Sequence, residues 1–93
     1  MEVKQLISAL EETIALLRTS EPSAWSSMST EDLIRRLEGE LAKATTDKPV
    51  DILFLECAFA PTSAMQELSI DNGWGTKFLK ISEVIDRYIG GVD

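Results

Sequence analysis

The chain has 93 residues, the length of one compact domain, and a formal charge of −7 at neutral pH. It contains no histidine and a single cysteine, so the side chain that most often shuttles protons is missing. This composition disfavours most enzymatic chemistry, and the acidic charge disfavours contact with nucleic-acid phosphates. We therefore expect a single non-enzymatic domain over residues 1–93, with no catalytic residues, no metal ligands, no cofactor and no nucleic-acid partner.

The apolar content, 44% of the residues, is sufficient for a hydrophobic core. No apolar run approaches the ~20 residues of a membrane-spanning helix, and the amino terminus lacks the basic start of a signal peptide. Cys57 lies in an apolar stretch, which predicts a buried free thiol. A free thiol is typical of a reducing compartment, so we expect no membrane partner and a cytoplasmic location.

The first predicted helix spans residues 2–19. Its apolar side chains recur every three or four residues and form one stripe, as in a helix that packs on one side. The stripe consists of Val3, Leu6, Ile7, Leu10, Ile14 and Leu17. Residues 20–28 are rich in serine and contain Pro22, which predicts a loop. We expect Trp25 to anchor this loop on the helices, with display to a partner as the alternative.

The second predicted helix spans residues 30–44. Ser29 and Asp32 resemble a capping box at its start. Its apolar face consists of Leu33, Ile34, Leu37, Leu41 and Ala44. Glu38 and Glu40 lie in no metal-binding spacing, so the sequence favours a solvated face for both. Residues 45–49 predict a break.

Residues 50–60 form an ambiguous segment, because they are apolar apart from Asp51 and Glu56. A buried strand and a buried helix both fit so short a run. We favour a helix, since no second segment could pair with a lone strand. Glu56 is interpreted either as a general acid or base, or more simply as an edge residue or the partner of Arg35 or Arg36.

Pro61 breaks the chain, and Ser63 with Gln66 predicts the start of a short helix that ends near Asp71. Asn72 and Gly73 form a strong stop signal. Thr76 is expected to cap the last helix, over residues 77–89, whose apolar face is wide. The fold class is therefore all-α, a bundle of four or five helices. Its predicted core consists of Leu6, Leu10, Ile14, Leu37, Leu41, Leu55, Phe59, Phe78, Ile81 and Ile85.

The least generic part of the chain is residues 60–75, where helix caps, a proline, two glycines and a tryptophan surround one short helix. One interpretation is a structural connector that holds the last helix on the core. The other is a partner-binding surface formed by Glu67, Asp71, Asn72 and Trp74. An aromatic anchor surrounded by polar groups is typical of protein interfaces.

The chain resembles the small helical immunity proteins of bacterial toxin systems in length, acidity, short loops and lack of a catalytic set. It lacks the paired-tyrosine motif of the colicin nuclease immunity proteins, because Tyr88 is its only tyrosine. No binding residue is therefore carried over from that family. The resemblance implies a protein-binding module that neutralises a basic toxin domain, as in a toxin–antitoxin pair. The alternative is a structural domain that forms a homodimer, and an enzyme that uses carboxylates alone comes third.

Overall fold

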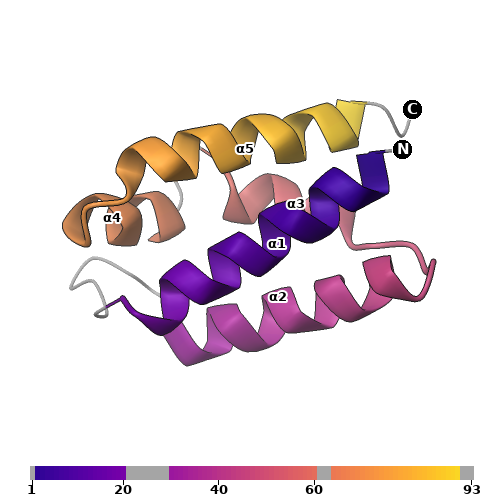
Figure 1. The fold of residues 1–93 in the computed structure, drawn as a ribbon, viewed down its shortest axis with the longest axis horizontal. Helices are drawn as coiled ribbons and strands as arrows, with labels where there is room; N and C mark the ends of the chain where they lie inside the picture. The colour runs from indigo at the N-terminus through magenta and orange to yellow at the C-terminus, as the bar shows by residue number, and fades with distance from the viewer. Residues whose placement is uncertain (1, 21–29, 61–63, 91–93) are drawn as a thin grey trace.

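The computed structural model describes residues 2–20, 30–60 and 64–90, and within these ranges all regular structure is helical (Figure 1). This confirms the predicted all-α class. The helices are α1 (Glu2–Arg18), α2 (Thr30–Thr45), α3 (Ile52–Ala58), α4 (Ala64–Asp71) and α5 (Gly75–Gly90). The predictions on Pro22 and the loop around it, Trp25, Ser29, Pro61 and Ser63 lie outside the described residues.

Helix α1 lies between α2 and α5 and packs against both (Figure 1). It runs antiparallel to each of them, so the start of α1 and the end of α5 lie at the same end of the molecule (Figure 1). The two short helices, α3 and α4, pack against α5. The Cα radius of gyration is 12.3 Å, the value expected for a compact chain of this length.

The core follows the predicted helix faces closely. Of the ten residues expected to be buried together, nine are buried, and Leu10, Leu37 and Ile85 are fully inaccessible. Leu41 is the exception, since it is only partly buried at the edge of the core. The three- and four-residue spacing of apolar side chains therefore places these helices correctly.

The ambiguous segment is helical, as predicted, although α3 is shorter than the apolar run that contains it. Asp51 is its N-cap, and one carboxylate oxygen accepts a hydrogen bond from the Phe54 backbone N–H at 3.0 Å. This bond satisfies one of the backbone donors left free in the first helical turn.

Two helices end in the same way, with a residue in the left-handed region. Asp47 after α2 has φ 59°, and Gly73 after α4 has φ 80°. In each case the next backbone N–H bonds to a carbonyl five residues back, Lys48 to Lys43 at 2.8 Å and Trp74 to Ser69 at 2.8 Å. These are Schellman motifs, and the predicted stop at Gly73 is confirmed.

The last helix begins earlier than predicted. Its first backbone bond runs from the Phe78 N–H to the Trp74 carbonyl, and α5 starts at Gly75. The prediction that Thr76 caps the helix is therefore wrong, because Thr76 already lies in the first turn. The Schellman motif at Gly73 turns the chain so tightly that α5 follows α4 almost at once.

Candidate functional site

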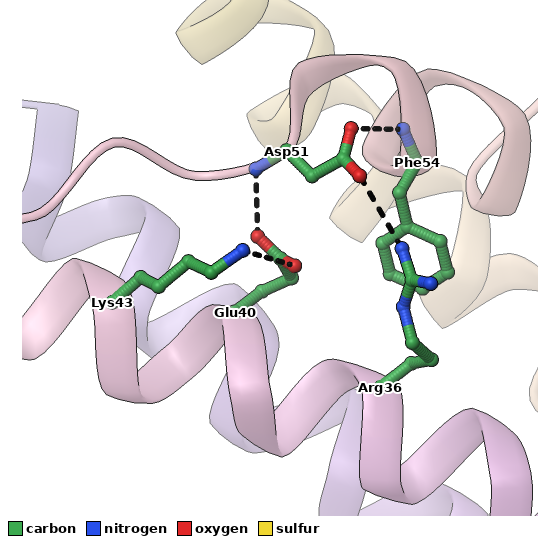
Figure 2. Close-up of polar contacts among 5 residues, drawn as sticks. All are labelled: Arg36, Glu40, Lys43, Asp51 and Phe54. Atoms are coloured by element: carbon green, nitrogen blue, oxygen red, sulfur yellow. Dashed lines mark hydrogen bonds and ion pairs between the residues drawn. The ribbon is translucent and has the colours of Figure 1, made fainter.

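The densest group of polar contacts joins α2 to the start of α3, and we call it the α2–α3 latch (Figure 2). It consists of Arg36, Glu40, Lys43, Asp51 and Phe54. Glu40 accepts a hydrogen bond from the Asp51 backbone N–H at 2.7 Å and pairs with the Lys43 ammonium at 3.2 Å. Asp51 pairs in turn with the Arg36 guanidinium at 3.3 Å, and that guanidinium lies 4.2 Å from the centre of the Phe54 ring.

Glu40 is the residue of this latch that sequence reasoning missed. It was expected on a solvated face, but only 3% of it is exposed. Its burial could have been predicted from its position, three residues after Leu37 and four before Ala44, on the buried face of α2. A charge on that face requires partners, which are Lys43 on α2 itself and the Asp51 backbone N–H on the returning chain.

The latch offers little for chemistry. Both oxygens of Glu40 and both oxygens of Asp51 are already engaged. In the described ranges, no group of three or more histidine, cysteine, aspartate or glutamate residues is placed to hold a metal ion. The geometry therefore gives the latch a structural role, fixing α3 to α2.

Only some of the residues predicted to bind a partner are exposed. Glu67 and Asp71 are exposed and lie four residues apart on α4, so they share one helix face. Asn72 is half-buried, and its side-chain amide donates a hydrogen bond to the Leu68 carbonyl at 2.9 Å. The two carboxylates thus lie together, whereas the amide also serves the end of the helix.

Trp74 does not lie on this surface. Only 6% of it is exposed, its ring packs edge-on against Phe78, and its indole N–H donates to the Ser20 hydroxyl at 2.8 Å. The expectation of a Trp74 surface anchor is therefore corrected: the ring ties the α4–α5 connection to the end of α1. Its position directly after the left-handed Gly73 turns it inward.

Two other apolar side chains near Trp74 in the sequence are exposed, whereas Trp74 is buried. Ile70 on α4 is 59% exposed and Leu79 on α5 is 55% exposed. Ile70 lies over Gly75, where an added Cβ would meet its Cγ1 at 3.3 Å. Because Gly75 and Leu79 are one turn apart, Leu79 continues the same face. We call Glu67, Ile70, Asp71 and Leu79 the α4–α5 corner.

The remaining candidates lie on the outer side of α3. Cys57 is exposed, so the prediction of a buried thiol is wrong. The short α3 buries Leu55 and Ala58, and Cys57 points away from them with Leu53. Glu56 is exposed as well, which agrees with its interpretation as an edge residue.

No helix in the described parts of the chain combines the length and the apolar content that a membrane span requires. Comparison with family models, with curated proteins and with solved structures found no match to this chain.

Proposed function

We propose that this domain is a non-enzymatic protein-binding module and that the α4–α5 corner is its partner surface. The observation that carries the proposal is the exposure of two large apolar side chains, Ile70 on α4 between the exposed carboxylates of Glu67 and Asp71, and Leu79 near the start of α5. Large apolar side chains that remain exposed next to polar groups are typical of interfaces. The buried Trp74 supports this surface, because it fixes the connection between α4 and α5.

The proposed partner is a basic protein. The chain carries 16 acidic and 9 basic residues, and a surplus of negative charge steers association with a positive surface. The sharpest form of the proposal is an immunity protein that covers a basic toxin domain in the cytoplasm. An exposed free thiol fits a reducing compartment, because Cys57 would be open to oxidation elsewhere.

The second candidate is a homodimer formed through the same corner. Ile70 and Leu79 would then pack against their copies, although the facing carboxylates would repel each other. Sedimentation separates the two candidates. A monomer with salt-sensitive affinity for a basic protein supports the first, and a dimer that is insensitive to salt supports the second.

The experiment is capture of the partner from the native source, followed by binding kinetics on two kinds of variant. Charge reversal at Glu67 and Asp71 should slow association and flatten its salt dependence, since charges at the edge of an interface act mainly on encounter. Ile70→Asp should instead speed dissociation, because it places a charge in the apolar centre.

The matched control is Leu53→Asp, which introduces the same charge at an apolar residue that is 71% exposed on α3. It should leave both rate constants unchanged. Equal binding by wild type and all corner variants, with every variant folded, would place the interface elsewhere.

A further inference from the structure

A second surface feature lies on another side of the bundle, in the groove between α1 and α5. Its volume is about 430 Å³, within the range of natural binding sites. The floor is apolar, made by Ala9, Ile81 and Val84, and both walls are polar. The remaining lining residues are Lys4, Gln5, Ser8, Glu12, Lys80 and Arg87.

Four basic residues outside this groove are paired with carboxylates, whereas those that line it, like Lys48 and Lys77 elsewhere, form no ion pair among the described residues. Arg18, Arg35, Arg36 and Lys43 each form an ion pair with a carboxylate. In the part of the chain that the structure describes, Lys4, Lys80 and Arg87 form none. Glu12 also lines the groove, but no ion pair joins it to these bases.

The residues that line the groove carry three bases, Lys4, Lys80 and Arg87, and one acid, Glu12, so their net charge is opposite in sign to that of the chain. Helix α5 carries three bases and two acids, so its net charge is +1 in a chain whose net charge is −7. Because α1 and α5 are antiparallel, Lys4 lies at the end of the groove where Arg87 lies (Figure 1). Three cations thus line an apolar floor together with one carboxylate, Glu12, which forms an ion pair with none of them in the described structure.

We propose that the α1–α5 groove binds an acidic amphipathic helix of a partner protein. Lys4, Lys80 and Arg87 would pair with its carboxylates, and its apolar side chains would lie on Ala9, Ile81 and Val84. The bases span about 10 Å along α5, which equals two helical turns of the occupant. A helix laid into a groove is a common mode of peptide recognition, and it requires a channel open along its length.

This site is separate from the α4–α5 corner. Leu79 and Val84 are about 140° apart around α5, so they face different sides of that helix. Nucleic acid is the less fitting anion, because its backbone calls for an extended basic surface, whereas the groove holds three cations. The groove and the corner would thus take partners of opposite charge.

The test uses a blocked helical peptide of about 18 residues, built from leucine, alanine and glutamate with the glutamates beside one leucine stripe. Its counterpart carries glutamine in place of glutamate. Titration calorimetry with the wild-type chain should show binding of the glutamate peptide that weakens as salt is added. The glutamine peptide should bind at least about tenfold more weakly, since it lacks the charged hydrogen bonds.

The decisive variant is Lys80→Gln with Arg87→Gln, which should weaken binding of the glutamate peptide by about tenfold or more. The matched control is Lys48→Gln with Lys77→Gln, which removes the same charge from two bases outside the groove and should bind as wild type does. Ile70→Asp should also bind the glutamate peptide as wild type does. The proposal for the groove can therefore fail without affecting the proposal for the α4–α5 corner, and the reverse.

Three results would overturn the proposal. The first is no binding of the glutamate peptide by the folded wild-type chain. The second is equal weakening by the groove variant and its control, which would reduce the effect to net charge. The third is a duplex oligonucleotide that binds more tightly than the peptide and loses affinity with the groove variant, since this would assign the groove to nucleic acid.

Discussion

Helices α2 and α5 have the same length, 16 residues, and the same number of basic residues, three each. All three bases of α2 are in ion pairs, with Asp32, Asp51 and Glu40. None of the three bases of α5 forms an ion pair within the described residues. On α2, Arg36 pairs with Asp51 on the returning chain before α3, and Arg35 and Lys43 pair with acids three residues earlier on α2 itself. One side of α5 instead borders an open groove.

This comparison shows that helices with equal numbers of basic residues can use them differently. Arg36 and Lys43 pair with the carboxylates that fix the start of α3, so they stabilise the fold, whereas Arg35 pairs only with the exposed Asp32. Lys80 and Arg87 on α5 stabilise nothing that the structure shows, so we assign their value to a partner. Variants on the two helices can separate these roles.

The largest expected effect is at Glu40. Glu40→Ala leaves the Asp51 backbone N–H without its acceptor, and an unsatisfied buried group costs about 1–3 kcal/mol in the free energy of unfolding. Glu40→Gln keeps an oxygen acceptor and should lie closer to wild type. Urea unfolding measures both.

The control for Glu40 is Glu38→Ala, two residues away on the same helix. Glu38 is 46% exposed and pairs with Arg18, and an exposed ion pair contributes less than about 1 kcal/mol. If Glu40→Ala lowered the free energy of unfolding no more than Glu38→Ala does, the structural role of the α2–α3 latch would be contradicted.

A smaller effect, of opposite sign, is expected at Gly39 in the middle of α2. An added Cβ there meets nothing within 4 Å, so Gly39→Ala should stabilise the protein by about 1 kcal/mol through helix propensity alone. Gly73→Ala is the matched control and should destabilise it, because φ at Gly73 is 80°. Thermal unfolding measures both changes, and a lower melting temperature for Gly39→Ala would mean that this face of α2 is not free.

Most of the fold is predictable from the sequence, because helix faces are local. The spacing of Leu6, Leu10 and Ile14 alone determines which side of α1 is buried. The stop at Asn72 and Gly73 is equally local, since only glycine readily takes the required left-handed φ. The facing of α3, which is apolar apart from Glu56, is not determined locally, which is why Cys57 was predicted in the core and lies outside it.

The candidate sites are less predictable, because they depend on contacts between distant segments. Trp74 is buried through its bond to Ser20, which is 54 residues away in the chain. The groove depends on α1 and α5 lying antiparallel. Residues 50–93 carry seven acids and three bases, so their charge gave no indication of the unpaired bases on α5. No spacing rule brings Lys4 and Arg87 to one groove.

The most direct measurement compares Arg36→Gln with Arg87→Gln by urea unfolding, without and with the glutamate peptide. Without peptide, Arg36→Gln should cost about 1 kcal/mol, since it removes an ion pair and a cation–π contact, and Arg87→Gln should stay within about 0.5 kcal/mol of wild type. Added peptide should stabilise wild type and Arg36→Gln equally, because a ligand of the folded state raises its stability, and should stabilise Arg87→Gln less. Equal costs for the two variants, or equal stabilisation of all three proteins by the peptide, would contradict the division of roles between α2 and α5.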